Sequence, residues 1–227
     1  MSKVERHPGH SHMNHIVRKT CISPEFRNRP MIHIRPMTAD DFTVFWPTFQ
    51  AVVLAQETYA YAPDLTFEQA RHLWLEYPLH TLIAEEDGVL LGSYYLKANA
   101  AGPGSHVSNC GYMVTLAARG RGVARLMCEQ SQQLALDSGF SAMQFNSVVA
   151  TNDVAVALWQ KLGFEIVGRL PRAYRHARLG LVDCLVMYKW LADMPASRKA
   201  KSPLLIGRKN IESVISRPRR KPSDGSA

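Results

Sequence analysis

Apolar and polar residues along this 227-residue chain recur with two different periods. Alternation at every second position predicts strands, and apolar residues three and four positions apart predict amphipathic helices. On this basis, strands are expected at residues 31–37, 81–86, 89–97, 106–114, 142–149, 165–170 and 181–191. Helices are expected at residues 42–53, 67–77, 123–139 and 153–162. Because helices alternate with strands, the chain is predicted to form an α+β (mixed α/β) sheet domain.

Local turn and cap signals mark where several of these segments begin and end. Asp87-Gly88 lies between two β-prone runs and predicts a tight hairpin turn. Residues 38–41 offer N-caps for the first helix, and Asn152 offers one for the last. Gly163 follows that last helix, where a residue that tolerates left-handed backbone commonly ends it.

Charge divides the chain into three segments. Residues 1–30 carry six Lys/Arg, two Asp/Glu and the His-rich run 7-HPGHSHMNH-15, and residues 195–227 carry nine Lys/Arg against two acids. Such polar, charged compositions are typical of disorder, so one folded domain is expected over residues 31–194. That body holds −3 of the total charge of +8, which does not indicate a nucleic-acid-binding fold.

The chain contains no apolar run of membrane-spanning length and no secretion signal near its start,. Its four cysteines lack CxxC spacing, which favours reduced thiols. We therefore expect a cytoplasmic protein with no membrane association. The His-rich start has no regular partner spacing, so no metal site is expected.

The run 119-RGRGVAR-125 stands between a predicted strand and a predicted helix and is a candidate phosphate-binding loop. It lacks the Gly-Lys-Ser/Thr ending of a Walker loop, and Arg125 replaces the third glycine of a dinucleotide motif. Arg119, Gly122 and Ala124 instead match the pattern R-x-x-G-x-A. The free amides at a helix start, and the positive end of its dipole, favour an anion such as a pyrophosphate.

This loop, together with a second run, resembles the GNAT superfamily of acetyl-CoA-dependent N-acetyltransferases. The first motif extends from Val114 to Ala124, and 152-NDVAVALWQKLGF-164 is similar to the second signature of that family. The resemblance covers about residues 31–191. It implies a strongly twisted mixed sheet with helices on both faces, whose fourth and fifth strands (106–114 and 142–149) splay apart around the cofactor arm.

The resemblance also implies which residues bind acetyl-CoA. Backbone groups near Met113 and Val114 would face the thioester, the amides of residues 121–125 would hold the pyrophosphate, and Asn152 would bond the cofactor arm. The cofactor-binding residues expected in this way are Met113, Val114, Arg119, Arg121, Gly122, Val123, Ala124, Arg125 and Asn152. An N–H facing the thioester would stabilise charge that develops on its oxygen.

Candidate catalytic residues are Asn109, Asn146 and Tyr112. Both asparagines interrupt predicted strands, where asparagine is depleted, so each is expected to have a partner. Together with Asn152 and the runs 144-QFNSVVATN-152 and 158-LWQKLGFEIVG-168, they resemble one branch of the family, the enzymes that acetylate azetidine-2-carboxylate and other proline analogues. This resemblance implies that Asn109 and Asn146 would hold the substrate carboxylate and orient its amine.

The proton donor is less defined. Where many members of the family carry a tyrosine acid, this chain has Trp159. Either Tyr112, Tyr174 or Tyr188 replaces it, or the thiolate leaves unassisted. Glu85 and Glu86 are candidate bases acting through water, or they merely solubilise the hairpin end. Tyr59 and Tyr61 would roof the acceptor pocket or only pack.

Three functions are consistent with the sequence. The leading one is transfer of acetyl from acetyl-CoA to a small-molecule amine, an amino acid or a proline analogue. The second is a protein or peptide N-acetyltransferase. The third is a binding module whose basic tail, with 217-RPRRKP-222, engages nucleic acid weakly through phosphates. A second copy of the chain, in a homodimer, is a further candidate partner.

Overall fold

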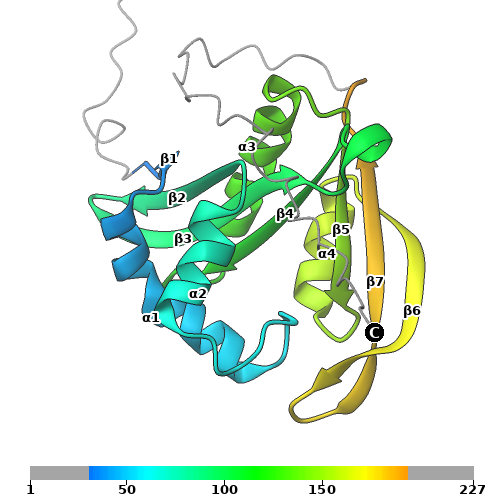
Figure 1. Cartoon of the computed structure of the whole chain (residues 1–227), viewed down its shortest axis with the longest axis horizontal. Coiled ribbons are helices and arrows are strands. Elements are labelled where there is room, and N and C mark those ends of the chain that lie inside the picture. The colour runs from blue at the N-terminus through cyan, green and yellow to red at the C-terminus, as the bar shows by residue number, and fades with distance from the viewer. Residues whose placement is uncertain (1–30, 194–227) are drawn as a thin grey trace, which may run out of the picture. The chain divides into compact units, whose positions relative to one another are not determined.

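The computed structural model describes residues 31–193, which form one seven-stranded mixed sheet with helices on both of its faces (Figure 1). The strand order is β1-β2-β3-β4-β5-β7-β6. The strands are β1 (His33–Pro36), β2 (His80–Glu86), β3 (Val89–Ala98), β4 (Val107–Val114), β5 (Ala142–Val149), β6 (Glu165–His176) and β7 (Gly180–Trp190). The helices are α1 (Ala39–Ala55), α2 (Phe67–Arg71), α3 (Val123–Asp137) and α4 (Asp153–Lys161).

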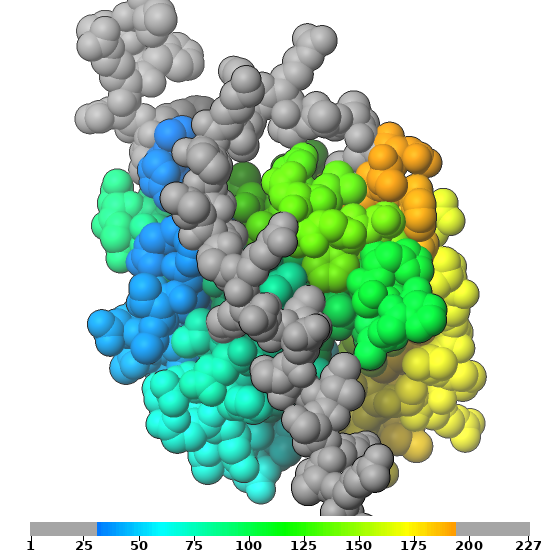
Figure 2. All heavy atoms as spheres, turned by 45° about the horizontal axis from the view of Figure 1, so that its top comes forward, coloured from blue at the N-terminus to red at the C-terminus, as the bar shows by residue number. Residues whose placement is uncertain are grey.

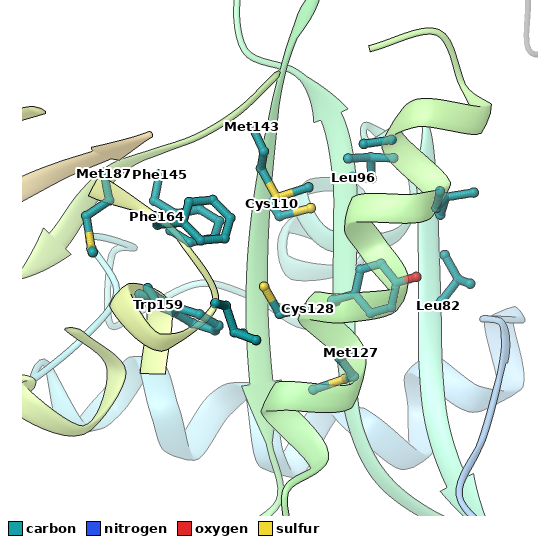
Figure 3. Packing of buried hydrophobic residues seen from close by; sticks show 14 of the residues in the cluster. Leu82, Leu96, Cys110, Met127, Cys128, Met143, Phe145, Trp159, Phe164 and Met187 are labelled. Carbon is teal, nitrogen blue, oxygen red and sulfur yellow. The ribbon is translucent and has the colours of Figure 1, made fainter. Parts of the chain in front are cut away.

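Alternating side chains of the strands enter two separate cores. Leu82 of β2 packs in the core that contains α3 and α4, whereas its neighbour Ile83 packs with α1 and the α2 segment. Figure 3 shows part of the first core, in which Trp159 lies beneath Phe145 and Phe164. The α1–α2 face and the α3–α4 face of the sheet are therefore distinct, as in the expected two-faced fold.

The local signals in the sequence act as predicted. Thr38 and Asp41 form a capping box at the start of α1, and Asp87 and Gly88 both have positive φ, at 51° and 78°, as a tight hairpin turn requires. One difference lies in the helix expected over residues 67–77. It is α-helical only to Arg71 and continues as a π-helix over His72–Glu76, whose wider turn places Trp74 in the core.

The fourth and fifth strands separate, as predicted. They pair in parallel only through Val107–Ala142, Ser108–Met143 and Asn109–Gln144. Beyond Asn109, β4 pairs only with β3, and β5 pairs only with β7, with a register shift between Phe145 and Val148. The free edges of β4 and β5 thus bound a gap that opens directly after the Asn109–Gln144 pair (Figure 1).

The predicted disordered ends, residues 1–30 and 195–227, lie outside the described residues, and so does the His-rich run. Within residues 31–193, no helix is both long and apolar enough to cross a membrane. In the same range, no three side chains of His, Cys, Asp or Glu gather as metal ligands would. Figure 2 shows α1 and α2 (blue to cyan) and β6 and β7 (yellow to orange) at opposite sides of the molecule.

Candidate active site

A cavity of about 1030 Å³ lies beside the end of β4, where β4 no longer pairs with β5. Its walls come from five segments: one face of α1, the loop directly after α1, the end of β4, the segment that leads into α3, and α4. Small or apolar residues dominate these walls, and an arginine–glycine loop forms one end. The predicted cofactor-binding residues that line it are Val114, Arg119, Gly122, Val123, Ala124, Arg125 and Asn152, and Gly120 and Trp159 line it beside them.

The loop before α3 has the backbone conformation that only glycine adopts without strain. Gly120 and Gly122 have φ of 77° and 81°, and open space surrounds the position of a Cβ on either one. The first intrahelical hydrogen bond of α3 runs from Leu126 N–H to the Gly122 carbonyl at 3.0 Å. The amides of Val123, Ala124 and Arg125 therefore precede the helical ladder, as free N-terminal amides do, on the cavity wall.

The three arginines of the loop are not equivalent. Arg121 is ion-paired with Glu86 at the end of β2, and it is absent from the cavity wall. Arg125 pairs with Glu129 at 2.9 Å, one turn along α3. Within residues 31–193, the guanidinium of Arg119 has no ion-pair partner, although it lines the cavity. Arg119 is thus the loop cation whose charge is left for a ligand.

The free edge of β4 turns backbone groups into the gap. The Thr115 N–H donates to the Leu91 carbonyl at 2.9 Å, so it points toward β3. Because successive N–H groups of a strand point to opposite sides, the Val114 N–H points into the gap. On the same side, the Tyr112 carbonyl accepts a 2.8 Å hydrogen bond from the Tyr59 hydroxyl.

Of two other predicted cofactor-binding residues, Asn152 lies on the cavity wall and Met113 does not. Met113 pairs with Ser93 in the β3 ladder, and its side chain is buried against α1, so it lies off the cavity wall. Asn152 lines the cavity and caps α4, with its Oδ1 accepting from the Ala155 N–H at 3.3 Å. The side-chain Nδ2 of Asn152 has no hydrogen-bond partner among the described residues, so its two N–H groups are available to a ligand.

Tyr112 and Trp159 form one wall of the cavity from the α3–α4 side. Their rings lie 5.1 Å apart, and the Tyr112 hydroxyl is bonded to Ser131 at 2.7 Å. Burial raises the pKa of Tyr112 well above its usual value. Its ring therefore contributes shape to the cavity, whereas its hydroxyl is bonded to α3 rather than free in the gap.

Asn109 lies at the point where the gap opens, on the α1–α2 face. Its Oδ1 accepts from the Tyr95 hydroxyl at 3.2 Å, and its Nδ2 donates to the Gln144 carbonyl at 2.9 Å. Asn146 is exposed, and its amide donates to Asn99 at 2.6 Å. Both asparagines therefore have the partners expected of them, and neither lies on the wall of the large cavity.

The carboxylates near the site are mostly paired. Glu85 accepts two hydrogen bonds from Arg35, and Glu86 is held by Arg121. Sequence reasoning overlooked Glu57, which lines the cavity and pairs with Arg178 at 2.7 Å. The only signal for Glu57 was its place two positions before Tyr59 in the loop after α1.

Several known proteins are similar to this chain in sequence and fold. The model of the acetyltransferase (GNAT) family matches residues 42–164. N-acetyltransferase aca1 of Schizosaccharomyces pombe is 35% identical over 98 residues, which cover 43% of this chain and 47% of that protein. The chain thus aligns with about half the length of this curated relative.

Two solved structures are similar over most of the described domain. A GCN5-related N-acetyltransferase from Kribbella flavida is 45% identical, with a TM-score of 0.68, and the match covers 70% of this chain and 98% of that one. A ribosomal-protein-alanine N-acetyltransferase from Brucella melitensis is 25% identical, with a TM-score of 0.63, over 70% of this chain and 99% of that one.

The protein belongs to the acetyltransferase (GNAT) family, a family of acyltransferases that use acetyl-CoA. The cavity fits such a ligand on three counts. It ends at unpaired helix amides suited to a pyrophosphate, its walls along α1 and α4 are apolar except at Thr48 and Lys161, and it borders an unpaired strand edge. The helix amides, the strand edge and the α4 wall belong to the two sequence motifs, whereas the α1 wall lies outside both motifs.

Proposed function

We propose that the protein transfers the acetyl group of acetyl-CoA directly to the amine of a small molecule. The observation that carries this proposal is one continuous cavity, which joins the free amides of α3 to the open edge of β4. A diphosphate needs the first feature, and an extended amide-containing arm can pair with the second.

Bound acetyl-CoA supplies its acetyl group as a thioester. The amides of Val123, Ala124 and Arg125 and the guanidinium of Arg119 bind its phosphates. The Asn152 amide donates to its arm. The Val114 N–H, which points into the gap, donates to an oxygen that gains negative charge, and such preorganised donors lower the barrier for acyl transfer.

Trp159 of α4, at the position where many family members carry a tyrosine acid, does not protonate the departing thiolate. Indole is no acid, and Trp159 is buried among aromatic rings. The Tyr112 hydroxyl is bonded to Ser131, and the Tyr174 hydroxyl donates to the Tyr59 carbonyl at 3.1 Å. Two of the predicted routes are consistent with these contacts. The first is protonation by Tyr188, which pairs with Gln144 across β5 and β7, and the second is unassisted departure, because a thiolate is a weak enough base to leave near neutral pH.

For the acceptor, we propose an amino acid or a proline analogue such as azetidine-2-carboxylate. Neutral amides at Asn109, Gln144 and Asn146 lie where β4 and β5 part. Such groups bind a carboxylate while adding no charge that would change the protonation of a nearby amine. The stacked rings of Tyr59 and Tyr61, 5.6 Å apart, cover this face.

A second candidate is acetylation of a protein N-terminus, because the Brucella melitensis protein carries a ribosomal-protein-alanine N-acetyltransferase name. The experiment that separates the two measures thiol release from acetyl-CoA with amino acids, proline analogues, polyamines and peptides with an N-terminal alanine. Small amino acids should react at least about ten times faster, by kcat/KM, than any peptide. A preference for peptides would instead support the second candidate.

Binding is tested separately. Coenzyme A at saturating concentration should raise the melting temperature, because a ligand present at 100 times its Kd adds about 2.7 kcal/mol of stability. A protein that melts identically with and without coenzyme A would rule out the proposed cofactor and with it the proposed reaction.

A further inference from the structure

Lys97 is a cation placed among aromatic rings on the acceptor side of the sheet. Its Nζ lies 4.9 Å from the centre of the Tyr77 ring and 5.5 Å from that of Tyr95. Within residues 31–193, it has no carboxylate partner. Burial lowers the pKa of Lys97, because desolvation disfavours its charged form. Aromatic faces offset only part of that cost, so an anionic ligand would be held strongly here.

The strand register places Lys97 beside the opening of the gap. Lys97 pairs with Asn109 across β3 and β4, and Asn109 pairs with Gln144 across β4 and β5. Directly paired residues project from the same face of a sheet. That face carries Tyr95, two positions before Lys97, which packs with α1 and the α2 segment. Lys97, Asn109 and Gln144 therefore form one row across β3, β4 and β5. This row contains Asn109–Gln144, the last parallel pair before the gap opens.

Amide groups extend this row into a continuous polar strip. The Gln144 amide donates to Asn146 at 2.8 Å, and the Asn146 amide donates to Asn99 at 2.6 Å. Asn109 holds the Tyr95 hydroxyl, which fixes the ring beneath the Lys97 ammonium. Gly111 makes this arrangement possible, because a Cβ there would lie 2.6 Å from the Tyr95 ring. The strip is built of neutral amides with one cation at its end.

We infer that Lys97 is a specificity-determining residue, whose ammonium pairs with a carboxylate of the acceptor while the amine of that acceptor faces the gap. This inference rests on the proposed acetyl transfer and adds the charge of the substrate to it. The site takes amines that carry a carboxylate, and it discriminates against their amides and esters. The neutral amides of Asn109 and Asn146 orient the acceptor, and Lys97 supplies the charge that selects it.

The test compares acid and carboxamide forms of the same acceptor in the full-length protein. The pairs are azetidine-2-carboxylate, proline and glycine, each with its carboxamide, measured by calorimetry with coenzyme A present and by kcat/KM with acetyl-CoA. Wild type should favour the acid of its best pair by about 10- to 100-fold, the range of a charge-assisted hydrogen bond. Lys97→Met, which keeps an apolar chain against the two rings, should reduce that preference to within about threefold.

Lys97→Arg is the matched control, because it retains the charge and should keep most of the preference for the acid. The inference is overturned if Lys97→Met weakens the acid and the carboxamide by the same factor, or if wild type binds no acid better than its carboxamide. Failure of the proposed reaction looks different: no amine would release thiol from acetyl-CoA, although the acid-over-amide preference could still be measured by calorimetry.

Discussion

The hydroxyl of Tyr59 donates a hydrogen bond of 2.8 Å to the backbone carbonyl of Tyr112. The two residues are 53 positions apart, and their contact ties the loop after α1 to the free edge of β4. The Tyr59 carbonyl in turn accepts from the Tyr174 hydroxyl of β6. Tyr59 thus connects the loop to both sides of the split sheet and fixes one side of the gap at the level of Tyr112.

Replacing Tyr59 by Phe should loosen this connection. The variant loses a buried hydrogen bond, which lowers the free energy of unfolding by about 1 kcal/mol, and it leaves the Tyr112 carbonyl free to solvent or ligand. We expect a fall of about 3- to 10-fold in kcat/KM for the acceptor, measured beside urea denaturation. Tyr61→Phe is the control, since its ring also stacks and its hydroxyl is bonded to Tyr95 of β3 rather than to β4. An effect of Tyr61→Phe as large as that of Tyr59→Phe would contradict this role.

Asn152 has two roles that substitution can separate. Asn152→Ala removes the cap of α4 and should cost about 1 kcal/mol of stability, together with a raised KM for acetyl-CoA. Asn152→Ser keeps a capping oxygen but lacks the amide donor, so it should restore stability while KM stays raised. Thermal melts and steady-state kinetics report the two effects. Full recovery of KM in the serine variant would show that Asn152 serves only as a cap.

Asn109→Ala, in contrast, should mainly harm use of the amine. It leaves the Tyr95 hydroxyl and the Gln144 carbonyl without their partner, next to the proposed acceptor site. We expect at least a 10-fold loss in kcat/KM for the acceptor, with little change in the KM for acetyl-CoA. If Asn109→Ala and Asn152→Ala changed both substrates equally, the division between acceptor and cofactor roles would be wrong.

Short-range signals made much of this architecture predictable. Caps such as Asn152 and turn residues such as Gly122 act within a few positions, so their structural consequences can be read directly from the sequence. Contacts between distant residues could not be predicted in this way. The Glu86–Arg121 pair joins residues 35 positions apart and depends on how α3 packs against β3 and β4, which no local pattern encodes. For the same reason, the sequence did not distinguish Arg119, Arg121 and Arg125, although in the structure Arg121 and Arg125 form ion pairs and Arg119 lines the cavity.

Acid should weaken the anchoring of α1. Arg35 forms hydrogen bonds of 2.6 and 2.8 Å with Asp41 and holds the pKa of that carboxyl well below its ordinary value of 3.8. A depressed pKa adds stability above the ordinary value, and this stability is lost as pH falls toward the folded-state value. The loss should appear between about pH 5 and pH 2 and, because the pair is partly solvated, amount to about 1 kcal/mol. Asp41→Asn should be less stable at pH 7 and should show a smaller part of this acid-dependent loss.

The unequal arginines of the cofactor loop lead to a prediction about charge. Arg119 lines the cavity without an ion-pair partner in residues 31–193, whereas Arg125 pairs with Glu129. Arg119→Gln should raise the KM for acetyl-CoA about 10-fold, the loss of one charge-assisted contact to phosphate. Arg125→Gln should raise it by less than about threefold, because its charge is already offset and well solvated. The difference should shrink as NaCl is raised toward 1 M, where screening shortens the reach of Arg119. Equal effects of the two variants at low salt would mean that the ion pair with Glu129 does not withhold Arg125 from the ligand.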